Sequence, residues 1–124
     1  MFNFSGTRPT NLGVKDGKLA PCPSSPNCVS SQSEDPQSKI DPLPLISIAD
    51  LKTIVANMDR TTIIEETDNY LYAEFKSNLM GYVDDVEFYR DSDANVVHVR
   101  SASRLGKSDL GVNRKRIEEI RSQL

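Results

Sequence analysis

Residues 70–104, YLYAEFKSNLMGYVDDVEFYRDSDANVVHVRSASR, are the stretch that decides the fold. Over Tyr70–Ser77, apolar residues alternate with larger polar or aromatic ones, which is the period of a β-strand with two different faces. A turn at Gly81 leads to a second strand-like run over 82–90, and a polar turn leads to a third over 96–104. The stretch therefore predicts consecutive antiparallel strands joined by short turns.

Elements on both sides of this stretch complete an α+β domain. Thr61–Glu66 is rich in β-formers and predicts a fourth strand. Before it, Ser47 is a good N-cap, and apolar residues at helical spacing predict an amphipathic helix over 48–58. A second helix is predicted over 108–124, starting at a Ser-Asp cap. Its apolar stripe consists of Leu110, Ile117, Ile120 and Leu124. The order predicts a four-stranded antiparallel sheet whose apolar face packs on two helices and whose other face is open.

The first 46 residues differ from the rest because they contain all seven prolines and no sustained periodicity. They predict a loop-rich N-terminal wrap over 1–46, laid on a helix–strands–helix core over 47–124, in one domain overall. The start of the chain lacks the features of a secretory signal, and no run approaches the roughly 18 apolar residues of a membrane span. We therefore expect a monomer that is cytoplasmic as written, or in the periplasm or thylakoid lumen if a leader has been removed.

Charge is distributed unevenly along the chain. The net charge of −3 argues against nucleic acid as a partner. Residues 100–124 nevertheless hold seven Lys or Arg against three acids, which leaves the remainder strongly acidic. This basic end is either a solvated helix whose cations complement its dipole, or a face that meets phosphate, a carboxylate or an acidic partner.

The alternation divides the strand residues between two faces of the predicted sheet. The face toward the helices is expected to hold Leu71, Ala73, Phe75, Val86, Phe88, Val97 and Val99. The opposite face then carries Tyr70, Tyr72, Glu74, Lys76, Val83, Asp85, Glu87, Tyr89, His98, Arg100, Ala102 and Arg104. Since cross-strand neighbours approach to about 5 Å, the carboxylates at 85 and 87 are expected to meet His98 and Arg100. This polar face is either a ladder of exposed ion pairs or a surface for a ligand or partner.

A second polar group is expected under the end of the sheet, on the side of the helices. Asp84 has the parity of the buried residues, and two serines of the next strand share its side. A buried carboxylate needs partners, and the last helix offers an amide on its apolar stripe. The predicted network is Asp84, Ser101, Ser103, Asn113 and Arg104. It is either a structural link between helix and sheet or part of a site.

The start of the last helix is a further candidate for an anion site. Backbone amides at a helix N-terminus attract phosphate or carboxylate groups. Arg104 and Lys107 lie just before this helix, and Arg114 lies one turn into it.

The two cysteines, Cys22 and Cys28, lie in a segment rich in Pro, Ser and Asn that is neither helix nor central strand. A zinc site needs further Cys or His ligands, and since His98 is the single histidine, no metal is expected. Three interpretations of the pair stay open: a disulfide or redox-active dithiol, two independent buried thiols, or a catalytic role. The chain has no dinucleotide fingerprint and no phosphate loop, and we expect no cofactor.

Three separated motifs make the chain resemble a known family. They are APCPSSPNCVSSQ at 20–32, GYVDDVEF at 81–88 and RSASRLGKSDLGVNRKRIE at 100–118. In this order they resemble the domain-of-unknown-function 1499 family of bacteria, cyanobacteria and plastids. The family has no established chemistry, so the resemblance implies no activity. Where its relatives occur suggests one hypothesis, a structural or assembly protein associated with photosynthetic membranes.

The residues themselves lead to two further hypotheses on function. The first is a non-catalytic module that binds an anionic small molecule or an acidic segment of a partner. The second is an enzyme that uses an Asp/Glu–Arg cluster on the sheet for acid–base chemistry. An enzyme is expected to show a concave pocket with a carboxylate of raised pKa, and a binding module a flat face of paired ions. The candidate ligand-binding residues are Asp84, Asp85, Glu87, Arg100, Ser101, Ser103, Arg104, Asn113 and Arg114, and no residue is assigned a catalytic role.

Overall fold

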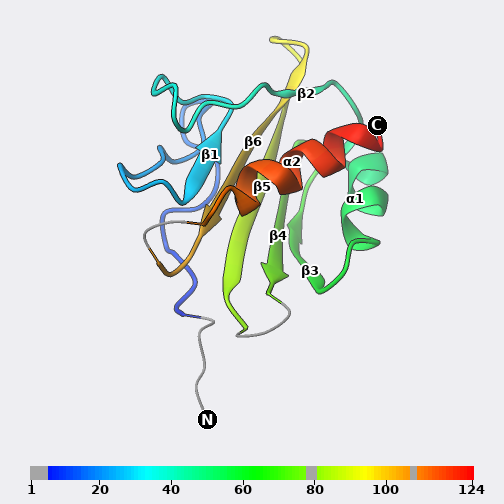
Figure 1. Cartoon of the computed structure of the whole chain (residues 1–124). Helices are drawn as coiled ribbons and strands as arrows, with labels where there is room; N and C mark the ends of the chain where they lie inside the picture. Colours follow the sequence, from blue (N-terminus) through cyan, green and yellow to red (C-terminus); the bar gives the residue numbers. More distant parts are fainter. Residues whose placement is uncertain (1–5, 78–80, 107–108) are drawn as a thin grey trace.

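A six-stranded sheet with antiparallel strand pairs forms the centre of the computed structural model, which describes residues 6–77, 81–106 and 109–124 (Figure 1). The strands are β1 (Cys28–Ser30), β2 (Leu43–Pro44), β3 (Thr61–Glu66), β4 (Tyr70–Lys76), β5 (Val83–Asp91) and β6 (Val96–Ser103). They lie in the order β1-β6-β5-β4-β3, and β2 also pairs with β6. The four longer strands thus follow one another both in sequence and in space.

The alternation in the central stretch correctly predicts β4, β5 and β6 and their faces. Each of these strands begins and ends within one residue of its predicted limits. All seven residues expected to face the helices are buried in one apolar core, together with residues of both helices. The α+β class is therefore confirmed, and the core lies between the sheet and the helices.

Within the described residues, two helices cover this face: α1 (Ile48–Ala56) and α2 (Val112–Ser122). The first begins where the sequence predicts, because the Ser47 hydroxyl accepts a hydrogen bond from the Asp50 backbone N–H at 3.1 Å. It ends two residues before the predicted limit, at a C-cap on Asn57.

The start of α2 corrects the sequence prediction. The helix begins at Val112 rather than at the Ser-Asp cap, of which Ser108 lies outside the described residues. Leu110 and Gly111 have φ angles of 53° and 82°, and these left-handed conformations do not continue into a right-handed helix. Leu110 is therefore 89% exposed instead of forming part of the apolar stripe, and Leu124 is also exposed. The buried members of the stripe are Ile117 and Ile120.

The number of strands is a second correction, since the sequence predicts four. The additional strands β1 and β2 come from the proline-rich segment and pair with β6, with Cys28 opposite Ala102 and Leu43 opposite Val97. Strands of three and two residues are too short to show a period, so the sequence pattern does not reveal them. They cover the edge that β6 would otherwise leave unpaired.

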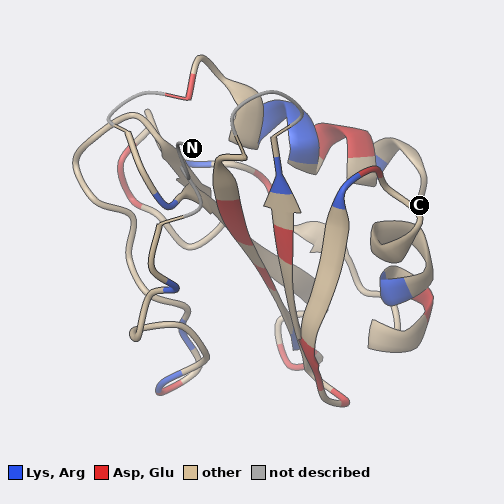
Figure 2. Ribbon diagram, turned by 90° about the horizontal axis from the view of Figure 1, so that it is seen from below, with Lys and Arg blue, Asp and Glu red and all other residues tan. Residues whose placement is uncertain are grey.

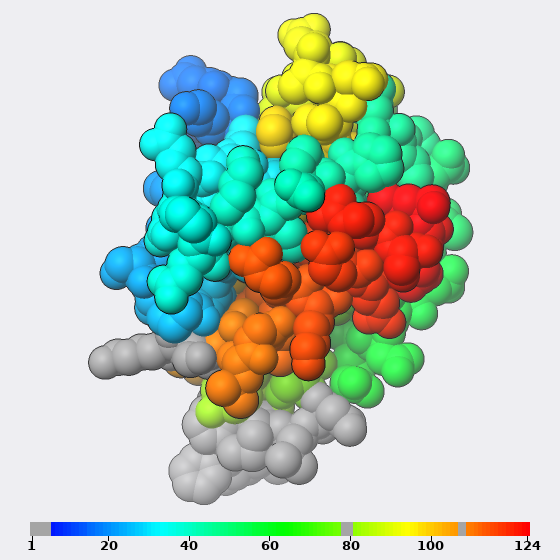
Figure 3. Space-filling view, turned by 45° about the horizontal axis from the view of Figure 1, so that its top comes forward, coloured from blue at the N-terminus to red at the C-terminus, as the bar shows by residue number. Residues whose placement is uncertain are grey.

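The segment that leads to β2 also holds α2 in place. The Arg114 guanidinium donates to the carbonyl oxygens of Lys39 and Gln37, at 2.9 and 3.1 Å. The Arg121 guanidinium donates to two further carbonyl oxygens of the same segment, both at 2.7 Å. In Figure 3, residues 31–45, in cyan and turquoise, accordingly lie along α2, in orange and red. The helix is thus fixed between the sheet and the N-terminal loops.

The other face of the sheet is covered, which corrects the expectation of an open face. Residues 6–22, here called the N-terminal strap, contact this face through apolar and polar groups. Apolar strap residues cluster with Tyr70 and Tyr72, and these are Leu12, Val14 and Leu19. Asp85 and Glu87 are consequently buried rather than exposed. Because the strap has neither a strand nor a helix period, its sequence alone does not place it on the sheet.

The outer strand β3 has an irregular pairing with β4. Ile63 lies opposite Ala73 and Glu65 lies opposite Tyr72, so that Ile64 is an inserted residue. Such a β-bulge interrupts the hydrogen-bond ladder and increases the local twist.

Candidate functional site

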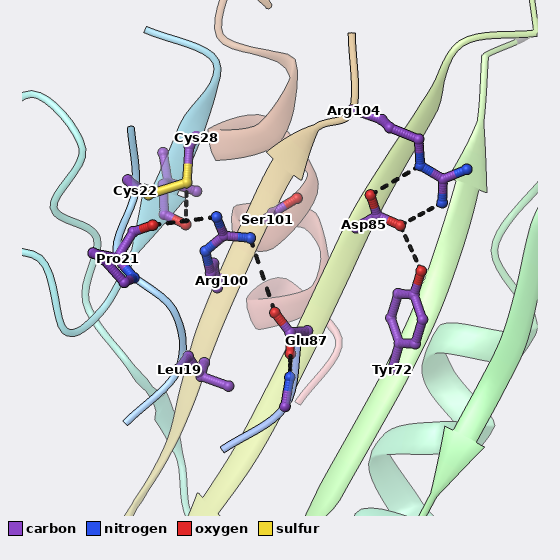
Figure 4. Close-up of polar contacts among 12 residues, drawn as sticks. Leu19, Pro21, Cys22, Cys28, Tyr72, Asp85, Glu87, Arg100, Ser101 and Arg104 are labelled. Atoms are coloured by element: carbon purple, nitrogen blue, oxygen red, sulfur yellow. Dashed lines mark hydrogen bonds and ion pairs between the residues drawn. A yellow bond between two sulfur atoms is a disulfide. The ribbon is translucent and has the colours of Figure 1, made fainter. Parts of the chain in front are cut away.

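Under the strap, Glu87 of β5 and Arg100 of β6 form a buried pair. They are directly opposite each other in the strand register, with 3.9 Å between Glu87 Oε1 and Arg100 Nη1. This part of the prediction is confirmed, but Asp85 lies opposite Ala102 and His98 opposite Tyr89. The other oxygen, Oε2, accepts hydrogen bonds from the Tyr70 hydroxyl at 2.5 Å and the Gly13 backbone N–H at 2.7 Å. Arg100 Nη2 donates to the Pro21 carbonyl oxygen at 3.3 Å (Figure 4). The strap therefore supplies two of the polar partners of this pair.

The buried pair is incompletely satisfied. Glu87 Oε1 and Arg100 Nε are both buried, and neither has a hydrogen-bond partner among the residues that the structure describes. Burial raises the pKa of Glu87 and lowers the pKa of Arg100, because the protein interior disfavours the charged form of each group. Covering these two side chains therefore carries a cost in free energy.

A second cluster lies toward one end of the same face, around Arg104, the residue that follows β6. Its Nε and Nη2 donate to the two carboxylate oxygens of Asp85 at 3.1 and 2.6 Å, and Nη2 also donates to Glu74 Oε2 at 2.8 Å. The same Glu74 oxygen accepts from Arg8 Nε at 2.7 Å, and the Tyr72 hydroxyl donates to Asp85 at 2.5 Å. Burial by itself would raise the pKa of Glu74, but the hydrogen bonds from the two arginines hold it below its ordinary value. Glu74 is thus ionised near neutral pH.

The Arg104 cluster forms one wall of a cavity of about 400 Å³, here called the basic cavity. Its lining residues are Arg8, Arg60, Thr62, Glu74, Lys76, Val83 and Arg104. Four of these side chains are cationic and one is acidic. Arg60 Nε donates to the Lys76 carbonyl oxygen at 3.3 Å, and in the part of the chain that the structure describes neither side chain has an ion-pair partner. Figure 2, seen from below, shows basic residues at the neighbouring ends of β3 and β4.

The sequence indicates only part of this arrangement. Among the predicted ligand-binding residues, Arg104 lines the basic cavity and Asp85 holds its guanidinium. Arg8 and Arg60 are missed because both lie outside the regular elements. Arg8 is 66 residues from Glu74 in the chain, so no local pattern connects them.

The polar network predicted on the helix side of the sheet forms without Arg104, and it also includes Arg116 and Asp109, whose Oδ2 accepts from Asn113 Nδ2 at 2.7 Å. Ser101 Oγ donates to Asn113 Oδ1 at 2.6 Å, and Asn113 Nδ2 donates to Ser103 Oγ at 3.0 Å. Asp84 joins through Arg116, whose Nη2 lies 2.7 Å from Asp84 Oδ2 and whose Nη1 donates to Asn113 Oδ1 at 2.9 Å. Helical spacing is the signal that would have found Arg116, because it follows Asn113 by three residues.

One arginine of the predicted network lies elsewhere. Arg104 does not join the network, because its side chain is on the strap side of the sheet, bonded to Asp85. Arg114 lines a small concavity with Asp109 and Gly111 at the start of α2, but its guanidinium donates to the backbone carbonyls at 37 and 39.

The anion site predicted at the start of the last helix is also corrected. The Asp109 carboxylate accepts hydrogen bonds from the backbone N–H groups of Gly111 at 2.8 Å and Asn113 at 3.1 Å. The chain therefore supplies its own anion to these amides. Lys107, the third cation expected there, lies outside the described residues.

Comparison with known proteins identifies the family. Residues 18–124 match the sequence profile of a family described as "Protein of unknown function (DUF1499)". The chain belongs to the DUF1499 family. The resemblance seen in the three motifs is thus confirmed, and it brings no activity with it. No curated protein and no solved structure matches the chain.

In this DUF1499 protein, Cys22 and Cys28 form a disulfide, with 2.01 Å between the sulfur atoms and 5.7 Å between the Cα atoms (Figure 4). The first of the three interpretations of the cysteines is therefore confirmed. Disulfides persist mainly in oxidising compartments. Among the described helices none is long and apolar enough to cross a bilayer. The location of the DUF1499 chain stays a prediction.

The single histidine lies in a group that superficially resembles a catalytic triad. His98 Nδ1 is 3.0 Å from Ser31 Oγ, and His98 Nε2 is 3.7 Å from Asp91 Oδ2. Ser31 is buried, however, and its Oγ already accepts a hydrogen bond from the Val99 backbone N–H at 2.9 Å. A nucleophile must reach its substrate, so this geometry does not suit nucleophilic catalysis. Over the described part of the DUF1499 chain, no group of three or more His, Cys, Asp or Glu residues is arranged to hold a metal.

Proposed function

We propose that this chain is a non-catalytic binding module that holds a small anion in the basic cavity. The observation that carries the proposal is the excess of positive charge around one concavity. Among the described lining residues, four cations face the single carboxylate of Glu74: Arg8 from the strap, Arg60 from the turn before β3, Lys76 from the end of β4 and Arg104 directly after β6.

The donors of the cavity suit an oxyanion. Arg104 is bonded to Asp85 and Glu74, and Arg8 shares Glu74 with it. Arg60 and the Lys76 ammonium therefore supply the uncompensated charge, and Thr62 adds a hydroxyl donor. Guanidinium groups bind phosphate or carboxylate oxygens in pairs, and these charge-assisted hydrogen bonds are stronger than neutral ones. A phosphate or carboxylate group is the ligand that this donor set favours.

The positions of the carboxylates favour binding over acid–base catalysis. The carboxylate with a raised pKa, Glu87, is fully buried and does not line the basic cavity. The carboxylate that does line it, Glu74, has a lowered pKa, and a group that is ionised well below neutral pH is a poor general acid.

The proposal is tested by titrating the ¹⁵N-labelled protein with inorganic phosphate at low ionic strength and following backbone amide shifts by NMR. We expect saturable shifts at Thr62 and Lys76, with a Kd of about 1 mM for two or three charge-assisted contacts. The Arg60→Gln/Lys76→Gln variant should bind at least tenfold more weakly. The matched control, Lys15→Gln/Lys18→Gln, removes the same charge from exposed positions away from the cavity. Equal weakening in both variants, or no saturable shifts in the parent protein, would contradict the proposal.

A further inference from the structure

The strap that carries Arg8 into the basic cavity is fastened at its other end by the disulfide. Between these ends, the Gly13 N–H donates a hydrogen bond to Glu87, and the Pro21 carbonyl oxygen accepts one from Arg100. Cys22 follows Pro21 directly and is joined to Cys28, the first residue of β1. Figure 4 shows the disulfide beside the contact between Pro21 and Arg100. The disulfide therefore fixes the end of the strap directly to the edge of the sheet next to the buried pair, where the chain alone would leave five residues between Cys22 and Cys28.

The closed strap is opposed by the groups that it covers. Within the described residues, Glu87 Oε1 and Arg100 Nε have no hydrogen-bond partner while they are buried, and the ion pair of Glu87 Oε1 with Arg100 Nη1 is long, at 3.9 Å. Opening the strap would return water to both atoms and recover part of their solvation free energy. A segment that covers incompletely paired charges opens more easily than one that covers apolar surface alone. The disulfide adds a covalent constraint against that opening, beside the apolar cluster of the strap and the hydrogen bonds of Gln32 to Leu19 and Gly17.

The disulfide can be reached from one side. Cys28 is 4% exposed, whereas Cys22 is half-buried and lines an open groove of about 740 Å³. The groove is polar and carries both signs of charge, with Lys15, Lys18, Glu34 and Asp35 among its lining residues. An incoming thiolate therefore meets Cys22 Sγ first.

We propose that the Cys22–Cys28 disulfide is a redox control of the basic cavity, opened by a dithiol oxidoreductase that docks in this groove. The partner's thiolate attacks Cys22 Sγ, forms a mixed disulfide and releases Cys28 as a thiolate. The partner's second thiol then attacks its own sulfur in the mixed disulfide and releases Cys22. Two electrons pass from the partner, which becomes a disulfide, and its two thiol protons end on Cys22 and Cys28.

Reduction releases the strap and weakens anion binding. Without its covalent anchor the strap leaves the buried pair, and Arg8 leaves the basic cavity. The cavity then loses one guanidinium, and we expect the Kd for phosphate to rise about tenfold. This regulation rests on the proposed function of the cavity. The oxidised protein is the form that binds.

The experiment measures two properties of the full chain, with and without dithiothreitol. One is the Kd for inorganic phosphate, and the other is the hydrogen-exchange rate of the Gly13 amide, which reports strap opening directly. We expect reduction to raise both values, with the far-UV circular dichroism spectrum unchanged. The Cys22→Ser/Cys28→Ser variant is the control: it should match the reduced protein and not respond to dithiothreitol. If that variant fails to fold, the oxidised and reduced forms of the parent protein still provide the comparison.

The outcomes separate this inference from the proposed function. An unchanged Kd together with an unchanged Gly13 exchange rate overturns the redox control. If the oxidised protein does not bind phosphate at all, the proposed function fails, and the link to binding fails with it. Faster Gly13 exchange on reduction would in that case support release of the strap alone. Reduction that leaves Gly13 protected while binding weakens would show that the strap is not the connecting element.

Discussion

The two faces of β5 are equally buried, but by different means. Val86 and Phe88 face the helices, Asp85 and Glu87 face the strap, and none of the four is more than 1% exposed. The first two pack in an apolar core, where burial is favourable at about 25 cal/mol per Å². The other two are covered by the strap, and burial of a charge is unfavourable unless it is fully paired. The alternation of a strand therefore distinguishes its two faces, but it does not show which of them is covered.

The largest effect is expected on the helix side. Phe88→Ala removes a fully buried ring and leaves a cavity, so the free energy of unfolding should fall by about 3–5 kcal/mol. Urea denaturation followed by circular dichroism measures this loss. Val112→Ala, at an exposed position, is the control and should stay within about 0.5 kcal/mol. A loss of less than about 1 kcal/mol for Phe88→Ala would contradict the account of the core.

On the strap side, a single substitution in the buried pair should lower the free energy of unfolding more than substitution of both residues. Arg100→Met leaves Glu87 buried without its counter-charge and should cost about 3 kcal/mol. In Glu87→Met/Arg100→Met both charges are gone, and part of the lost stability should return, although the Tyr70 hydroxyl and the Gly13 N–H lose their acceptor. The same urea denaturation distinguishes the two variants. Equal destabilisation by both would mean that packing, and not charge, determines the stability of this face.

The smallest expected effect is a difference between two carboxylates of the same face in their response to pH. The lowered pKa of Glu74 means that its contribution to stability is complete above its ordinary value of 4.5 and is lost as the pH falls through the folded value. The raised pKa of Glu87 reverses this: its contribution is complete below 4.5 and is lost as the pH rises through the folded value. Relative to the parent protein, Glu74→Gln should be less stable at about pH 7 than at about pH 3.5, and Glu87→Gln the reverse. Urea denaturation at both pH values tests this. If the stability of both variants relative to the parent protein changed in the same direction with pH, the opposite pKa shifts of Glu74 and Glu87 would be contradicted.

The sequence predicts the elements that have a period and misses the parts that lack one. The alternation of apolar and polar residues in β4, β5 and β6 predicts where these strands begin and end, which side chains face the helices, and the contact between Glu87 and Arg100. The network of Ser101, Ser103 and Asn113 also follows from parity and helical spacing. These predictions succeed because a regular element fixes where each side chain points.

The remainder depends on contacts between residues distant in sequence. The position of the strap follows from single bonds such as that from Gly13 to Glu87, across 74 residues of chain. Arg60 has a φ of 54° at the turn before β3, and no periodic pattern directs its side chain into the basic cavity. The proposed site is therefore hard to derive from the sequence because three of its four cations, Arg8, Arg60 and Arg104, lie outside regular structure.

The β-bulge at Ile64 affects the tendency of this protein to self-associate through the edge of its sheet. One side of the sheet ends in β6 with β1 and β2 paired along it, so β3 is the outer strand on the other side. An unpaired strand is a template on which a further chain can add. Here an incoming strand would find the ladder broken after Ile63 and two carboxylates, Glu65 and Glu66, beyond the break. The β-bulge that interrupts the pairing of β3 with β4 thus disfavours edge-to-edge association of the sheets of two molecules.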